Sequence, residues 1–258
     1  MLAEERLEEI FRRLRNRGTL AVDDVAQEFN VSLDTVRRDF NRLAGTRGVR
    51  RTHGGIFLEK VAADSTLAER ALEASTEKLA IARRAAQLVD DGETIVVDAG
   101  TTTGLMVEYI EARDVTLITS SVEIASRALR RANLTVYIAG GMVRGSTGSA
   151  VGDDTLRMIR SLHASTAFIG ANGFSMAHGL MTPNYHEAGV KRAMIEISSR
   201  RVLLVDSSKA ERRALARFGD LAEMDVVISD GGLDPDIAGE LGEVVSEVLV
   251  VDGEHTQP

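Results

Sequence analysis

Seven short apolar segments recur along the last two thirds of the chain and constrain its fold more than any other feature. Each is four to six residues long and rich in Val, Ile or Leu, which is typical of buried strands. The segments are Thr94–Asp98, Val115–Thr119, Leu134–Ala139, Thr166–Gly170, Arg201–Asp206, Val226–Ser229 and Val248–Val251. Most gaps between them hold a helical stretch, such as Lys78–Val89. This alternation predicts an α/β fold with a mostly parallel sheet covered by helices on both faces.

The first sixty residues follow a helical pattern instead. Apolar residues recur at helical spacing from Leu2 to Leu14 and predict a first helix that closes at Gly18. A short second helix is expected in TLAVDDVAQEF, and Ser32 is placed to cap a third helix from Leu33 to about Ala44. Two short extended pieces in TRGVRRTHGGIFL then predict a hairpin. Together these elements predict a winged helix-turn-helix.

The stretch VRRDFNRLAGTRGVRRTHGG, residues 36–55, carries six arginines and one acid, although the whole chain has 31 basic and 39 acidic side chains. A local basic patch on an acidic chain indicates contact with a polyanion. The alternative is a solvated helix face, but several of these arginines lie beyond the third helix. We expect the helix to read the major groove, and the wing to hold phosphates or to enter the minor groove. The residues expected at the DNA are Ser32, Thr35, Arg37, Arg38, Arg50, Arg51, His53 and Gly54.

Polar residues follow the predicted strands, where ligands sit in open parallel sheets. Asp98 ends the first strand, and Gly100 with the hydroxyl run Thr101–Thr103 opens a helix, which favours an anion seat. Further candidates follow other strands or share one face of a later helix. They are Thr119, Asn172, Glu187, Lys191 and Lys209.

Lysine is scarce, because only 4 of the 31 basic residues are Lys. Three of them, Lys78, Lys191 and Lys209, fall at a helix start or beside a strand end in the candidate pocket. A lysine ammonium is a compact point charge, so its retention indicates positions that a guanidinium would not fit. Two alternatives stay open: chance among few residues, and a structural Glu187–Lys191 pair within one helix.

The motif VSLDTVRRDFNRL…GVRRTHGG resembles the N-terminal signature of the DeoR family of bacterial transcriptional regulators. Later blocks, including VVDAGTTT, AGGMVRGSTGSAVG, GLMTPNYHEAGVKRAMI and LLVDSSK, are similar to the effector domain of that family. The family's effector domain resembles the fold of ribose-5-phosphate isomerase and glucosamine-6-phosphate deaminase. The expected organisation is a winged helix-turn-helix in residues 1–57, a linker in 58–75 and an effector-binding α/β domain in 76–258.

The resemblance implies a regulator, more often a repressor, of sugar metabolism that responds to a phosphorylated sugar. It implies that Gly100–Thr103 seat the phosphate and that Lys78 helps to neutralise it. Asp98, Asn172, Glu187, Lys191 and Lys209 would line the sugar. Two positions depart from the family pattern: Phe40 stands in place of Leu, and Ser120 stands in place of Asn.

The alternative function is a sugar-phosphate isomerase with an added DNA-binding arm, in which Asp98, Glu187 and Lys209 perform acid–base chemistry. A wing and a basic helix would have no purpose in a pure enzyme, so we expect a regulator without catalytic residues, metal or cofactor. Its expected partners are operator DNA, a phosphorylated sugar and further copies of itself, as a homodimer or homotetramer. The absence of cysteine and the charged N-terminus favour the cytoplasm, and no apolar run is long enough for a membrane.

Overall fold

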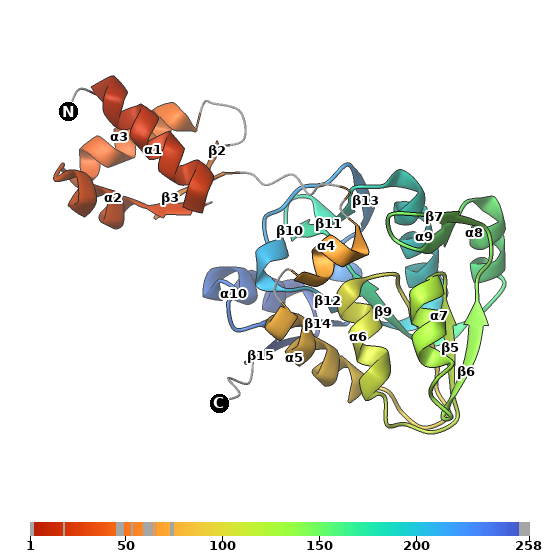
Figure 1. The fold of residues 1–258 in the computed structure, drawn as a ribbon. Helices are drawn as coiled ribbons and strands as arrows, with labels where there is room; N and C mark the ends of the chain where they lie inside the picture. The colour runs from red at the N-terminus through yellow and green to blue at the C-terminus, as the bar shows by residue number, and fades with distance from the viewer. Residues whose placement is uncertain are drawn as a thin grey trace. The chain divides into compact units, whose positions relative to one another are not determined.

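The computed structural model describes residues 3–17, 19–44, 49–52, 54–58, 64, 66–72 and 75–252. The chain divides into two compact units, Met1–Val61 and Ala62–Pro258 (Figure 1). Among the described residues, no helix combines the length and apolarity that crossing a bilayer requires. The segment expected to be a linker contains one short helix, and the boundaries expected at residues 57 and 75 stay a prediction.

The N-terminal unit contains three helices and a small antiparallel sheet with the strand order β1-β3-β2. Its elements are α1 (Ala3–Arg17), β1 (Thr19–Ala21), α2 (Val22–Phe29), α3 (Leu33–Leu43), β2 (Val49–Arg51) and β3 (Gly55–Leu58). The three helices and the β2–β3 wing confirm the sequence prediction. Strand β1 was missed, because three residues are too short to show a period of two.

Local chemistry explains the ends of these helices. The Ser32 hydroxyl accepts a hydrogen bond from the backbone N–H of Thr35 (3.2 Å) and caps α3 as predicted. Val36, Phe40 and Leu43 turn into the core, where Phe40 is fully buried. At Gly55 an added Cβ would lie 2.2 Å from the carbonyl oxygen of Leu20, so only glycine lets β3 approach β1 this closely.

The C-terminal unit is built on a seven-stranded parallel sheet with the order β15-β14-β12-β9-β4-β5-β6. Its strands are β4 (Thr94–Val97), β5 (Val115–Thr119), β6 (Leu134–Ile138), β9 (Ala164–Gly170), β12 (Ser198–Leu204), β14 (Val226–Asp230) and β15 (Glu247–Val251). These are the seven predicted strands with small shifts at their ends, and every pair between neighbours is parallel.

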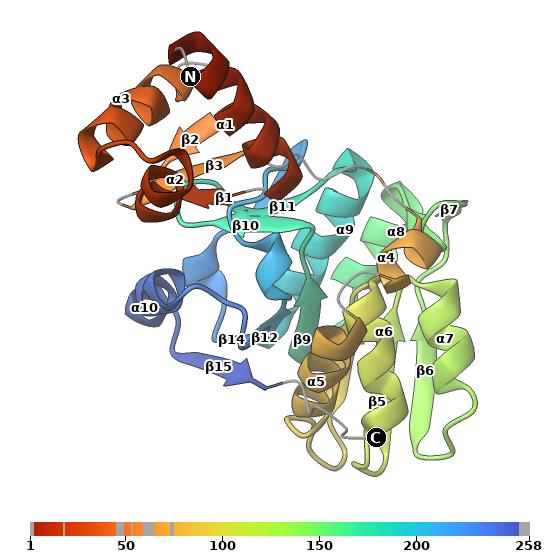
Figure 2. The same ribbon diagram turned by 60° about the vertical axis from the view of Figure 1, so that its left-hand side comes forward.

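Helices cover both faces of this sheet, as predicted (Figures 1 and 2). Along the chain they are α4 (Leu67–Leu72), α5 (Ser75–Ala86), α6 (Thr101–Met106), α7 (Val122–Ala128), α8 (Asp153–Arg160), α9 (Tyr185–Glu196) and α10 (Pro235–Val244), with short 3-10 turns at Val107–Tyr109, Ser207–Lys209 and Leu221–Glu223. Helices α5, α6 and α7 pack on one face through Ile81, Met106 and Ile124. Helices α8, α9 and α10 pack on the other through Ile159, Met194 and Leu241. Strand side chains alternate between the two cores, as in Ile95 and Val96.

Two smaller sheets were not predicted. Strands β10 (Gly173–Ser175), β11 (Gly179–Thr182) and β13 (Ala216–Gly219) form an antiparallel sheet. The glycine-rich stretch 140–152 contains a hairpin of β7 (Met142–Arg144) and β8 (Ser149–Val151). Strands of only three or four residues carry too little pattern to be recognised.

Candidate functional site

The N-terminal half of α3 presents polar side chains outward in the N-terminal unit. Arg37 and Arg38 are exposed, and a guanidinium nitrogen of Arg37 lies 3.2 Å from the carboxylate of Asp34. The hydroxyl groups of Ser32 and Thr35 hydrogen bond to each other at 2.9 Å. The opposite side of α3 is anchored by Asp39, which is buried and accepts hydrogen bonds from Arg6 of α1 at 2.6 and 3.3 Å. The helix is therefore fixed with its basic face toward solvent.

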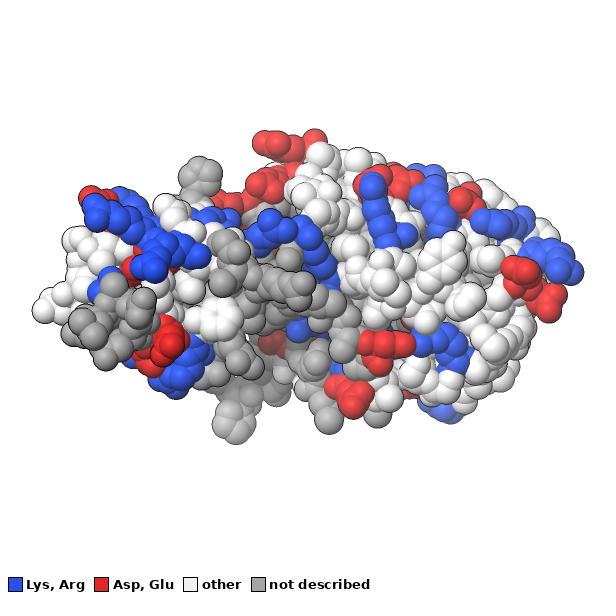
Figure 3. Space-filling view, turned by 90° about the horizontal axis from the view of Figure 1, so that it is seen from above, with Lys and Arg blue, Asp and Glu red and all other residues white. Residues whose placement is uncertain are grey.

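The wing contributes a second group of basic side chains. A guanidinium nitrogen of Arg51 donates to the backbone carbonyl of Arg37 (3.1 Å) and to the side chain of Asn41 (2.9 Å), so it braces the wing against α3. Arg50 and Gly54 are exposed. His53 lies outside the described residues. On the face drawn in Figure 3, basic and acidic side chains lie beside one another. The attraction of an anion to any point on this face therefore depends on the nearby side chains more than on the net charge of −8.

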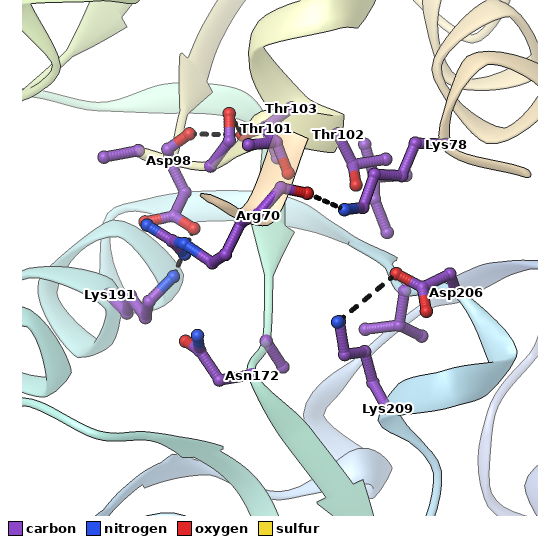
Figure 4. Close-up of a pocket in the computed structure, with 15 residues that line it drawn as sticks. Arg70, Lys78, Asp98, Thr101, Thr102, Thr103, Asn172, Lys191, Asp206 and Lys209 are labelled. Carbon is purple, nitrogen blue, oxygen red and sulfur yellow. Dashed lines mark hydrogen bonds and ion pairs between the residues drawn. The ribbon is translucent and has the colours of Figure 1, made fainter. Parts of the chain in front are cut away.

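A pocket in the C-terminal unit lies beyond the carboxyl ends of β4, β9 and β12. From β4 the chain continues outward to β5 and β6, then returns to β9 on the other side of β4. The gap between β4 and β9 is therefore the point where the strand order reverses, the usual ligand site of an open parallel sheet. Its polar lining is Arg70, Lys78, Asp98, Gly100, Thr101, Thr102, Thr103, Asn172, Lys191, Asp206 and Lys209 (Figure 4).

Charge is the dominant property of this pocket. Four cationic side chains and two carboxylates line it, a formal excess of two positive charges. Lys78, Lys191 and Lys209 are at least nine-tenths buried, as are Asp98 and Asp206. Concentrated positive charge inside an acidic chain favours an anionic ligand, because the low dielectric of a buried site strengthens the attraction.

Lys191 and Asp98 join the ends of β4 and β9. The ammonium of Lys191 donates to the carboxylate of Asp98 and to the backbone carbonyl of Gly170, the latter at 2.9 Å. The same carboxylate accepts from the backbone N–H of Gly170 at 3.1 Å. This buried ion pair fixes the geometry of the strand ends, and both side chains also line the pocket.

Lys78 and Arg70 enter the pocket from helices α5 and α4. The ammonium of Lys78 donates to the backbone carbonyl of Arg70, which holds α4 against the site. The Arg70 guanidinium extends into the pocket, and its Nε and Nη2 atoms are buried without a hydrogen-bond partner among the described residues. Buried donors without partners are rare and costly in folded proteins, so a ligand oxygen is a natural partner for them.

The hydroxyl run at the start of α6 is partly used by the protein itself. The Thr103 hydroxyl donates to the backbone carbonyl of Asp98 at 2.6 Å and closes the loop before α6. Thr101 and Thr102 line the pocket without that role. On the far side of the pocket, the Lys209 ammonium lies 3.7 Å from the carboxylate of Asp206.

Two expected ligand residues lie away from the pocket lining. The buried hydroxyl of Thr119 donates to the backbone carbonyl of Val97 at 2.8 Å. Glu187 accepts hydrogen bonds from Arg144 of β7 and from the hydroxyl of Thr147 (2.6 Å). Glu187 thus forms its ion pair with Arg144, whereas Lys191 forms its ion pair with Asp98. Ser120, the departure from the family pattern, also lies outside the lining, and its hydroxyl is 3.3 Å from that of Ser149.

Arg144 carries a second ion pair and connects three parts of the unit. Besides Glu187, it pairs with Asp64, which precedes α4. Burial opposes its charge, but the carboxylates of Glu187 and Asp64 outweigh this and raise the pKa of Arg144 above the ordinary value. The backbone N–H of Leu67 also donates to the carbonyl of Ser146 in the same hairpin (3.0 Å).

Sequence reasoning missed Arg70 and left Asp206 out of the expected ligand residues. Asp206 is the last residue of a predicted strand, so its position was a usable signal. Arg70 lies in an alanine-rich stretch without periodicity, and no local pattern distinguishes it from the other arginines. Only the fold brings it to the strand ends.

Comparison with known proteins adds independent findings. Residues 6–60 match the DeoR-like helix-turn-helix domain, and residues 73–231 match the DeoR C terminal sensor domain. The chain is 33% identical over 237 residues to the lactose phosphotransferase system repressor of Streptococcus mutans, covering 89% of this chain and 93% of that protein. It is 29% identical over 222 residues to the glycerol-3-phosphate regulon repressor of Escherichia coli, covering 86% and 88%. A solved ribose 5-phosphate isomerase A from Methanocaldococcus jannaschii is 21% identical, with a TM-score of 0.38, covering 52% and 53% of the chains.

Proposed function

The chain belongs to the DeoR family of DNA-binding transcriptional regulators, and from that premise we propose that it represses an operon of sugar metabolism under the control of a phosphorylated sugar. The relatives are named as repressors rather than enzymes, so the isomerase alternative is set aside. Its partner is operator DNA, which we expect it to meet in the cytoplasm as a homodimer or homotetramer.

The buried positive pocket at the β4–β9 switch point carries this proposal. Arg70, Lys78, Lys191 and Lys209 supply more charge than Asp98 and Asp206 neutralise. A phosphate at neutral pH bears up to two negative charges and would balance the excess. We assign the phosphate to the side of the pocket formed by Gly100–Thr103 and Lys78. The carboxylates, with Asn172, would accept and donate hydrogen bonds to sugar hydroxyls.

Ligand control requires that the effector bind one conformation of the protein more tightly than another. About 40 Å³ of the pocket admits the centre of a water molecule, whereas the empty space among its lining atoms, open solvent included, is about 430 Å³. A sugar phosphate needs more room than the first of these volumes, and outward movement of Arg70 or of α4 would supply it. Helix α4 follows directly on the chain segment from the DNA-binding unit. Its displacement is therefore the proposed origin of the change in operator affinity.

Thermal unfolding of the purified full chain tests this function. A ligand that binds only the folded protein raises Tm by mass action. We expect a rise with one phosphorylated sugar from a panel and none with its unphosphorylated counterpart. The same compound should change operator affinity in a gel-shift titration. Equal shifts with the phosphorylated and free sugars would remove the phosphate from the proposal.

A further inference from the structure

The outer edge of strand β6 is the open end of the seven-stranded sheet. The backbone N–H of Ala139 donates to the carbonyl of Thr119 in β5 (2.8 Å), which fixes the alternation along β6. Thr135, Tyr137 and Ala139 therefore direct backbone groups toward β5, whereas Val136 and Ile138 direct theirs away from the sheet. An outward row of unpaired N–H and C=O groups is a template for another strand.

This edge lacks the usual protection against pairing. Natural edge strands carry Lys, other charges, Pro or bulges, but residues 132–143 contain no Lys, Arg, Asp, Glu or Pro. Tyr137 and Ile138 are 48% and 44% exposed, and Met142 and Val143, just beyond the strand, are 65% and 50% exposed. The strand at the opposite end of the sheet, β15, begins at Glu247 and is followed by Asp252.

Neighbouring helix α7 extends the apolar surface. It packs beside β6 in both ribbon views, and it contributes Val122, which is 47% exposed; Leu129, directly after it, is 74% exposed. Exposed apolar side chains occurring singly need no explanation. Four of them lie on β6 or just beyond it, and Val122 and Leu129 belong to the adjoining α7, which also carries Glu123 and Arg127; together the six mark an interaction surface. We define the β6 edge as Tyr137, Ile138, Met142, Val143, Val122 and Leu129.

Charge selects the partner for the β6 edge. The chain has a net charge of −8, so two copies repel one another wherever their charged surfaces meet. Residues 132–143 carry no charged side chain, so identical acidic chains can meet along β6 at little electrostatic cost. An antiparallel strand pair is also self-complementary about a twofold axis, as a closed dimer requires.

We propose that a second copy of this chain docks on the β6 edge, with the two β6 strands antiparallel around a twofold axis. The inference rests on the proposed function in one respect: helix-turn-helix proteins read paired half-sites as twofold dimers. In such a pair the outward backbone N–H and C=O groups of Val136 and Ile138 in each copy would hydrogen bond to the outward backbone groups of β6 in the other copy. The two seven-stranded sheets would become one.

The first test measures the mass of the full chain by sedimentation equilibrium, for the unchanged protein and two variants. Tyr137→Lys/Ile138→Lys places four like charges across the twofold axis and should weaken association at least tenfold. Leu215→Lys is the matched control, because Leu215 is 79% exposed but lies directly before β13 of the small sheet. Circular dichroism verifies that each variant is folded.

Each outcome of the sedimentation measurements either supports or overturns the proposed interface. A dimer that the β6 variant dissociates and the control variant leaves intact supports the proposal. A dimer that the β6 variant leaves intact overturns the proposal that copies associate through the β6 edge, but it agrees with a homo-oligomeric regulator. A dimer lost in Leu215→Lys places the interface on the small sheet. A monomeric unchanged protein overturns both the β6 edge and the expected homo-oligomer, whereas a sugar-phosphate response measured separately would remain.

Cysteine crosslinking supplies a second readout that does not depend on charge repulsion. The chain has no cysteine, so single cysteines introduced in turn at Thr135, Val136, Tyr137 and Ile138 have only their own copy as a partner. Across an antiparallel pair, Cα atoms near the twofold axis lie about 4.5 to 5.5 Å apart, within disulfide range. Rapid oxidation to a linked dimer is expected at one or two of these positions and not at Leu215→Cys. Absence of linkage at all four overturns the antiparallel pairing.

Discussion

Arg144 and Asp64 form an ion pair across 80 residues of sequence, and it joins the β7–β8 hairpin to the chain segment before α4. The same guanidinium also pairs with Glu187 at the start of α9. Three residues beyond Asp64, the backbone of Leu67 bonds to the hairpin as well. Because Arg70 of the following helix lines the pocket, the hairpin, this segment and the ligand site form one connected group of contacts.

Asp64→Asn should weaken the coupling between effector and operator. The variant removes one partner of Arg144 but leaves its pair with Glu187 intact, so the sensor unit should stay folded. The Asp64 side chain is 42% exposed, and such pairs are worth roughly 0.5–1 kcal/mol, or about a two- to fivefold change in coupling. The ratio of operator affinities with and without effector measures it. An unchanged ratio would exclude this ion pair from the coupling.

Arg70→Met should separate stability from ligand response. Two buried guanidinium nitrogens of Arg70 have no partner among the described residues, so replacement by an apolar side chain of similar length should leave Tm unchanged or raise it. The rise in Tm caused by the sugar phosphate should be lost. Arg70→Lys, which keeps a positive charge, is the control and should retain part of the response. A full response in Arg70→Met would show that Arg70 does not contact the effector.

Thr102→Glu should abolish the response to a phosphorylated effector. Thr102 is 8% exposed and lines the pocket beside Lys78, so a carboxylate there would occupy the positive field and repel a phosphate. Thr102→Gln has the same size without the charge and should retain more of the response. Thermal shifts of both variants with the sugar phosphate provide the comparison. Equal losses in both would point to steric blocking instead of charge.

The large sheet was predictable because parallel strands buried on both faces are apolar along their whole length, as Ile95–Val97 are. The antiparallel strands were not, since Gly173–Ser175 gains its partners only through tertiary pairing. In the pocket, Asp98 could be found from its place after a strand. Glu187 shows what residue spacing cannot predict. It shares a helix face with Lys191, but it lies one turn away, a rise of about 5.4 Å, and therefore contacts the β7–β8 hairpin and not the pocket.

Lys191→Met should destabilise the sensor unit by about 3 kcal/mol, because it leaves the carboxylate of Asp98 buried without its cation. The double variant Lys191→Met/Asp98→Asn removes both charges and should recover part of that loss. Urea unfolding of the full chain, followed through the sensor transition, gives the coupling energy by a double-mutant cycle. Additive losses would show that the buried pair does not act as a unit.

Arg38→Ala should weaken operator binding through loss of a contact from the outward face of α3. Removing a base or phosphate contact from a recognition helix costs about 1–3 kcal/mol, or roughly five- to 150-fold in Kd. If Arg38 holds a phosphate, the dependence of log Kd on log salt should also fall by about one, whereas a base contact should relax sequence preference at one position. Arg12→Ala is the matched control: it removes the same charge from an exposed side chain of α1, paired with Glu9, in the same unit. Gel-shift titrations at several salt concentrations measure both. Equal losses in the two variants would mean that net charge, and not the face of α3, determines the affinity.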